Sequence, residues 1–178
     1  LASGPKSKDY KNELENYIKN KKPFVIALNS TVNVNSQFVD VFAACHPLRL
    51  IADAELYKSL KSPLVVPIIL LSQNLKKKFK KLKLLNFGIG IKENNFEFRK
   101  KGAVVPRLYA LAYALSIATS GNASKILLAG FDGFGPYDRR TKTIDELISL
   151  YVSCKNSKPI LAVTPTSYNV PSKSIYAL

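Results

Sequence analysis

This sequence of 178 residues contains only one histidine and two cysteines, and it has no methionine. These numbers exclude a zinc cage of cysteine and histidine ligands, and Cys45 and Cys154 alone do not make a disulfide framework. Two cysteines without such a framework fit a reducing compartment, so we expect a cytoplasmic protein. No apolar run approaches the roughly 20 residues of a membrane-spanning helix, and no transmembrane segment is expected.

Arginine is also scarce. Of 27 basic residues, 22 are lysine and five are arginine, and the formal net charge is +15. This charge favours an anionic partner, but geometric recognition of bases and phosphates relies on arginine, so nucleic acid is not the partner we expect. Residues 75–83, LKKKFKKLK, place three apolar residues on one helical face. That pattern is typical of a helix on a membrane surface or nucleic acid, or, as we favour, of a solvated helix with a thin apolar stripe.

Apolar segments that fit strands alternate with segments of helical spacing, without internal repeats or low-complexity linkers. Strands are predicted at residues 1–4, 23–29, 38–45, 64–70, 84–91, 95–98, 125–132 and 158–166. Helices are predicted at residues 8–20, 52–60, 75–83, 104–119 and 144–153, the last with a capping box of Thr143 and Glu146.

The predicted strands are apolar throughout, as in parallel sheets covered on both faces. We therefore predict an α/β fold, a single Rossmann-like domain with a mostly parallel sheet and helices on both faces. The first residue is Leu1, in what reads as the end of a strand, so we expect a domain excised from a longer chain.

In an open α/β sheet, ligands bind beyond the carboxyl ends of the strands. After the first predicted strand, Ser3, Gly4, Pro5, Lys6 and Ser7 make a glycine turn into a helix. Such a turn predicts free backbone N–H groups that bind an anion, and the glycine lets a ligand approach closely. The alternative is an ordinary strand-to-helix turn. The turn matches neither a Walker loop nor a GxGxxG fingerprint, so neither ATP hydrolysis nor NAD binding is predicted.

Further candidate ligand-binding residues follow other predicted strands. Asn29 and Ser30 follow the second strand, and an amide there can bind a ribose, a base edge or a sugar, or simply form a turn. Gly130 and Asp132 lie in a loop with three glycines, where the carboxylate either binds a ligand hydroxyl or caps the turn. Thr166 follows the last strand.

No catalytic set is predicted. His46 is the only imidazole, and it is interpreted either as a general base at a strand end or, as we favour, as a structural residue. A single histidine with no placed partner does not establish a Ser-His-Asp or Cys-His arrangement. Arg139 and Arg140 either clamp an anion or belong to a solvated loop, which we favour.

Four stretches, in the same order along the chain, resemble bacterial sialyltransferases of the lipooligosaccharide type. They are ASGPKSK, FVIALN, KILLAGFD and PILAVTPTS. The opening is also similar to hydroxymethylpterin pyrophosphokinase-like domains. It is similar as well to a C-terminal domain of hydroxy-oxovalerate aldolase or HMG-CoA lyase-like proteins in surface-polysaccharide clusters.

The sialyltransferase resemblance implies that Gly4, Pro5 and Asn29 contact a cytidine nucleotide sugar, with the turn from Gly130 to Asp132 beside it. The chain departs from that family at several points. Lys6 precedes Ser7, where the family has Ser then Leu, and residues 102–106 replace its Thr-Ser-Gly. The family's catalytic histidine lies in a late lid, and this chain has no histidine after residue 46, so sialyl transfer by that mechanism is not predicted.

Three functions follow as hypotheses. The first is a glycosyltransferase-like domain of bacterial surface-glycan biosynthesis that binds a small anionic ligand, CMP- or another nucleotide sugar, with no other cofactor expected. The second is a non-catalytic C-terminal domain of an aldolase whose barrel lies upstream in the same chain. The third is a basic protein that binds nucleic acid or a membrane surface, based on the net charge and the lysine-rich segment.

Overall fold

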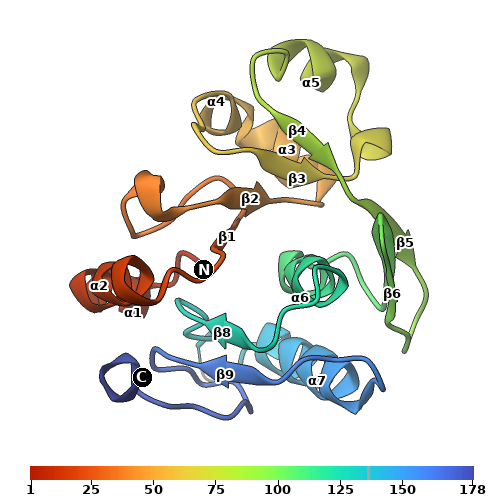
Figure 1. Ribbon diagram of the computed structural model, residues 1–178. Helices are drawn as coiled ribbons and strands as arrows, with labels where there is room; N and C mark the ends of the chain where they lie inside the picture. The colour runs from red at the N-terminus through yellow and green to blue at the C-terminus, as the bar shows by residue number, and fades with distance from the viewer. Residues whose placement is uncertain (136) are drawn as a thin grey trace.

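The structure is a computed structural model that describes residues 1–135 and 137–178. Its largest sheet has four parallel strands that follow one another in the order of the chain (Figure 1). They are β1 (Ile26–Leu28), β2 (Val41–Ala43), β3 (Leu64–Val66) and β4 (Leu84–Asn86). A second parallel pair consists of β8 (Ile126–Leu128) and β9 (Ile160–Ala162). Parallel pairing of these apolar strands confirms this part of the prediction.

The first residues of the chain connect these two sheets. The Leu1 nitrogen donates to the Ile26 carbonyl at 2.6 Å, and the Leu28 N–H donates to the Leu1 carbonyl at 2.8 Å. On the other side, the Ala2 N–H donates to the Ala129 carbonyl at 2.8 Å. Residues 1–4 therefore run between β1 and β8 and bond to both of them as a strand would.

A third sheet is mixed, in the order β5-β7-β6. Its strands are β5 (Gly88–Ile91), β6 (Glu97–Arg99) and β7 (Gly102–Val105), with β5 parallel and β6 antiparallel to β7. The prediction of one strand over residues 84–91 is wrong, because the chain leaves the first sheet after β4 and enters this one as β5. The helix predicted from residue 104 begins at Ala110 instead, since Val104 and Val105 pair with neighbouring strands.

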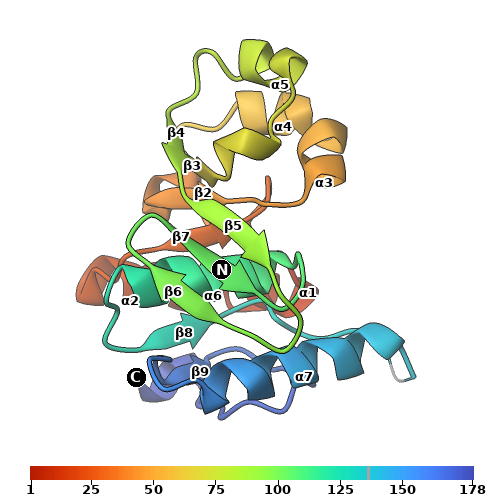
Figure 2. The ribbon, with the colours of Figure 1, turned by 90° about the vertical axis from the view of Figure 1, so that its right-hand side faces the viewer.

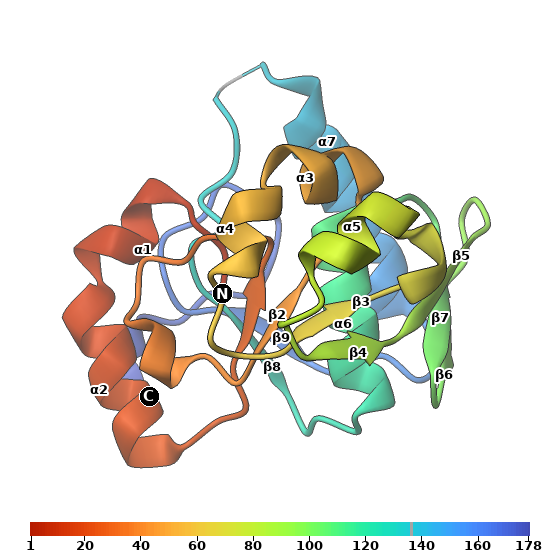
Figure 3. The ribbon, with the colours of Figure 1, turned by 90° about the horizontal axis from the view of Figure 1, so that it is seen from above.

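Helices cover both faces of the parallel strands (Figures 1 and 3). They are α1 (Pro5–Asp9), α2 (Lys11–Lys21), α3 (Pro47–Ala52), α4 (Ala54–Lys58), α5 (Gln73–Lys78), α6 (Ala110–Ser120) and α7 (Arg139–Ser153), with short 3-10 turns η1 (Ser36–Phe38), η2 (Ile68–Leu70) and η3 (Ile175–Ala177). Among the described residues, no helix is both long and apolar enough to cross a membrane.

Two apolar cores result, because successive strand residues point to opposite faces. Ala27 and Phe42 face a core that contains residues of α2, α3, α4 and α5. Leu28 and Val41 face the other core, against α6 and α7. The strand β8 contributes to both cores, and the mixed sheet packs against α6 (Figure 2). Burial on both faces explains why these strands read as continuous apolar runs.

Several helix boundaries differ from the predictions. The helix predicted over residues 8–20 is divided at Tyr10 into α1 and α2, and the one predicted over 75–83 ends at Lys78. The capping box at Thr143 is wrong, because α7 begins at Arg139 and its N-cap is Asp138. The Asp138 carboxylate accepts from the Arg140 N–H at 2.9 Å, which stabilises a helix start five residues before the predicted one.

Candidate functional site

The predicted turn after residues 1–4 packs against the loop that follows β8. The Gly4 N–H donates to the Gly130 carbonyl at 3.0 Å, and Gly130 has a φ of +76°. A Cβ atom on Gly4 would lie 2.4 Å from the Gly130 carbonyl oxygen, and one on Gly130 would lie 2.3 Å from the Ala2 carbonyl oxygen. The two glycines are therefore required for a close approach of backbone to backbone, rather than of backbone to ligand.

Asp132 occupies the start of α1. Its Oδ2 atom accepts from the Lys6 N–H at 2.6 Å, so this carboxylate stands where an anionic ligand was predicted to bind. The Ser7 N–H donates to the Gly4 carbonyl at 3.1 Å, and Pro5 has no N–H to offer. The expectation that this turn presents free N–H groups to an anion is therefore wrong for Gly4, Lys6 and Ser7, because each of these groups already donates within the protein.

The other carboxylate oxygen of Asp132 makes no hydrogen bond to a described residue. Oδ1 is shielded from solvent and has no hydrogen-bond partner among residues 1–135 and 137–178. A carboxylate oxygen accepts hydrogen bonds strongly, and leaving one unbonded away from water is costly. Asp132 therefore caps α1 with one oxygen, whereas the other is covered by the protein and would be reached by a ligand hydroxyl only after a local movement.

A residue that the sequence reading missed holds the turn from the side. The Asn33 amide donates to the Gly4 carbonyl at 3.0 Å and to the Ser7 hydroxyl at 2.7 Å. Ser7 is buried, and its hydroxyl donates in turn to the Gly4 carbonyl at 2.8 Å. Asn33 lies 26 residues from Ser7 along the chain, so no local spacing pattern indicates this contact.

Asn29 lies beside the turn, in a row with Ser3 and Asp132 at the carboxyl edge of the sheet. It directly follows β1 and has a φ of +60°, a left-handed conformation that asparagine tolerates better than most residues. Because Leu1 pairs with the backbone on both sides of Ala27, the register places Ser3 next to Asn29. The Asn29 side chain is half-buried and makes no hydrogen bond to any described residue, and Ser3 is exposed.

Two other predicted residues have structural partners. The Ser30 hydroxyl donates to Asp53 at 2.9 Å, and Asp53 also pairs with Arg49 at 3.1 Å. The Thr166 hydroxyl donates to the Phe131 carbonyl at 2.5 Å and accepts from the Tyr168 N–H at 3.1 Å. Ser30 therefore fixes the end of β1 to the α3–α4 segment, and Thr166 fixes the loops after β8 and β9 to each other.

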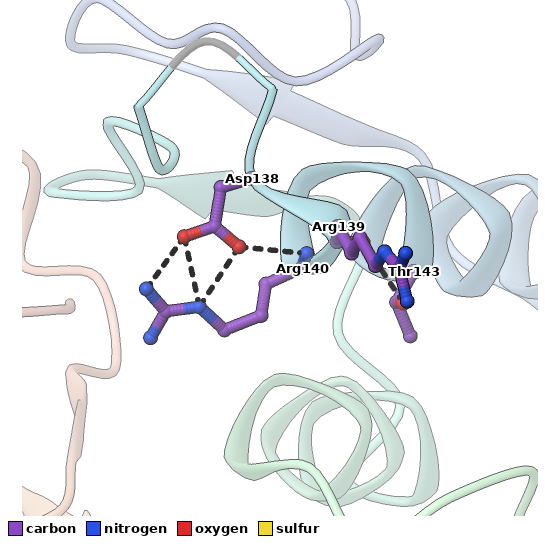
Figure 4. A network of polar contacts seen from close by, with 4 residues as sticks. All are labelled: Asp138, Arg139, Arg140 and Thr143. Atoms are coloured by element: carbon purple, nitrogen blue, oxygen red, sulfur yellow. Dashed lines mark hydrogen bonds and ion pairs between the residues drawn. The ribbon is translucent and has the colours of Figure 1, made fainter.

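The neighbouring residues Arg139 and Arg140 make different contacts. Arg140 forms an ion pair with Asp138 at 2.6 Å and lies over the Phe134 ring at 4.0 Å, whereas only the carbonyl of Arg139 takes part in the contacts drawn, with Thr143 (Figure 4). Hydrogen bonds from Arg140 hold the pKa of the Asp138 carboxyl below its usual value. The Arg140 guanidinium is thus engaged, and the two side chains do not form a clamp.

His46 lies at the same carboxyl edge of the sheet, directly after the buried Cys45. It is exposed and is the N-cap residue of α3, where its carbonyl accepts from the Leu50 N–H at 3.0 Å. Its side chain does not cap the helix. Among the described residues, no group of three or more His, Cys, Asp or Glu side chains is placed to hold a metal ion.

An apolar cavity runs along β1 and β8. A cavity of about 710 Å³ is lined mainly by apolar side chains. Its lining includes Pro23 and Phe24, which precede β1, and Lys125, which precedes β8. The lining also includes Phe131 and Val163, which follow β8 and β9, so the cavity extends along the length of these strands.

Comparison of the chain with family models, with curated proteins and with solved structures finds no match. The geometry described above is therefore the basis for the function proposed below.

Proposed function

We propose that the chain is a Rossmann-like, glycosyltransferase-like domain that binds a nucleotide or nucleotide sugar in bacterial surface-glycan biosynthesis. The observation that carries the proposal is the row formed by Asn29, Ser3 and Asp132 at the carboxyl edge. In α/β sheets this edge is where ligands bind. The row offers an amide, a hydroxyl and a carboxylate oxygen, and the amide and that oxygen make no hydrogen bond within the described chain.

These groups suit the sugar part of a nucleotide better than its phosphates. The Asn29 amide both donates to and accepts from a base edge or a hydroxyl, and Asp132 Oδ1 accepts from a ribose hydroxyl once a local movement uncovers it. The N–H groups of Gly4, Lys6 and Ser7 are already bonded, so the phosphates depend on the exposed Lys6 side chain and on Ser3. We therefore expect the nucleoside and sugar hydroxyls to dominate recognition.

The proposal is tested with a panel of CMP, CDP and UDP and their sugar conjugates, by following thermal unfolding of the chain. A ligand of the folded state stabilises it by about 2.7 kcal/mol at about a hundredfold excess over its dissociation constant. We expect at least one nucleotide to raise the unfolding temperature. An unchanged temperature with every nucleotide would contradict the proposal.

Variants then locate the site. Asn29→Gly keeps the left-handed backbone and removes the amide, so the chain should fold and its ligand-induced stabilisation should disappear. Asn94→Gly is the matched control, because Asn94 also has a positive φ, of 54°, but lies exposed in the turn between β5 and β6. An equal loss of ligand-induced stabilisation in both variants would show that the ligand binds elsewhere.

The second candidate is a non-catalytic C-terminal domain of an aldolase. It is favoured by the internal hydrogen bonds that saturate the Gly4–Ser7 turn, as expected for a turn with a structural role. A chain that unfolds at the same temperature with every nucleotide, but is stabilised by association with an aldolase barrel, would support this candidate over the first.

A further inference from the structure

The lysine-rich end of the molecule lies outside the row of candidate ligand groups. Helix α5 and the turn after it carry six exposed lysines: Lys76, Lys77, Lys78, Lys80, Lys81 and Lys83. The apolar residues of the same segment, Leu75, Phe79 and Leu82, are all buried in the core. The apolar stripe is therefore already used by the fold, which excludes insertion of this stripe into a membrane.

Helix α4 extends the charged surface. It lies against α5 (Figure 3). Glu55 pairs with both Lys58 and Lys78 at 3.4 Å. Lys58 and Lys61 are exposed and join the six lysines above; we call these eight residues the lysine patch. Residues 54–61 and 73–83 contain eight lysines and one acidic residue, Glu55, a net charge of +7. Nearly half of the net charge of the chain is thus gathered on two adjacent segments.

This concentration has no structural explanation within the fold. Like charges held close together repel one another, and Glu55 is the only acidic residue of the two segments to offset them. A surface of this kind is complementary to an extended anionic surface, which relieves the repulsion.

We propose that the lysine patch docks the protein on anionic lipid headgroups at a membrane surface. Lysine binds such a surface as a point charge, and several lysines together give stable association. A nucleic-acid site would instead be expected to use arginine and exposed aromatic rings, but both segments lack arginine, and their rings, Tyr57 and Phe79, are buried. Ile69, on η2 just before α5, is 86% exposed and supplies an apolar contact beside the charges.

The test is co-sedimentation of the full chain with vesicles of phosphatidylcholine alone and of phosphatidylcholine mixed with phosphatidylglycerol. We expect binding only to the mixed vesicles, and binding that weakens as salt is added, because salt screens exposed charges. The patch variant replaces Lys76, Lys77, Lys80 and Lys81 by glutamine, and leaves Lys78 paired with Glu55. Its affinity for the mixed vesicles should fall about tenfold or more.

The matched control replaces four exposed lysines outside the patch, Lys92, Lys100, Lys101 and Lys155, by glutamine, so the change in net charge is the same. It should retain most of the binding. Equal losses in the two variants would show that diffuse charge, not the patch, is responsible, and would overturn the proposal. Absence of vesicle binding, or patch-dependent binding to a single-stranded oligonucleotide without vesicle binding, would overturn it too. Nucleotide binding is measured separately and does not depend on this outcome.

Discussion

The contribution of a buried tyrosine to stability depends on whether its hydroxyl has a hydrogen-bond partner. Tyr57 and Tyr151 are both fully buried. The Tyr151 hydroxyl lies 2.6 Å from the Thr119 hydroxyl and accepts from the Lys158 N–H at 2.9 Å. The Tyr57 hydroxyl has no partner among the described residues. Two residues that look alike in the sequence therefore have opposite energetic roles.

Replacing each tyrosine by phenylalanine tests this difference. Tyr151→Phe leaves the Lys158 N–H without its acceptor, so we expect a loss of about 1–3 kcal/mol in the free energy of unfolding. Tyr57→Phe removes an unbonded hydroxyl and should leave the stability unchanged or raise it. Urea unfolding of both variants measures the two values. A larger loss for Tyr57→Phe than for Tyr151→Phe would contradict the hydrogen bonds described.

At the scale of elements, the sequence predicted the alternation of strands and helices but not their long-range contacts. The parallel strands are apolar because both faces are buried, so their pattern is visible locally. The contact of Asp132 with the Lys6 N–H joins residues 126 positions apart, and no local pattern could reveal that the predicted anion site was already occupied. Likewise, Asn33 was missed, whereas Asn29 was found because it directly follows a strand.

The junction between residues 1–4 and the loop after β8 can be tested by one substitution and a control. In Gly4→Ala, the new Cβ would lie 2.4 Å from the Gly130 carbonyl oxygen, so the backbone must shift, and we expect a loss of about 1–3 kcal/mol in stability. Gly135→Ala changes a glycine of the same loop, where no described atom beyond the chain neighbours lies within 4 Å of the new Cβ. It should change stability by less than about 0.5 kcal/mol. Equal thermal stabilities for the two variants would contradict the close approach.

For the molecule as a whole, burial determines how stability depends on pH. Burial raises the pKa of the Cys45 thiol from 9.0 to about 12. Above about pH 9, the unfolded chain therefore loses a proton that the folded protein retains, and folding becomes less favourable as the pH rises. Burial also raises the pKa values of Tyr57 and Tyr113, so the same trend continues at higher pH.

We expect the free energy of unfolding to fall between about pH 9 and pH 10, with Cys45 contributing at most about 1.4 kcal/mol per pH unit. In Cys45→Ala this contribution is absent, so the decline should be shallower, although the variant is less stable at neutral pH. Urea unfolding at several pH values gives both slopes. Identical slopes for the two proteins would show that Cys45 is not the source.

The position of a bound nucleotide tests the proposed function most directly. The measurement is a titration of the ¹⁵N-labelled chain with the nucleotide that stabilises it best, followed by NMR. We expect the largest shifts at the Asn29 side-chain amide and at the backbone N–H groups of Ser3 and Asp132. Shifts confined to the lysine patch, or to Phe24 and Lys125 at the amino ends of β1 and β8, would contradict a nucleotide site at the carboxyl edge of the sheet.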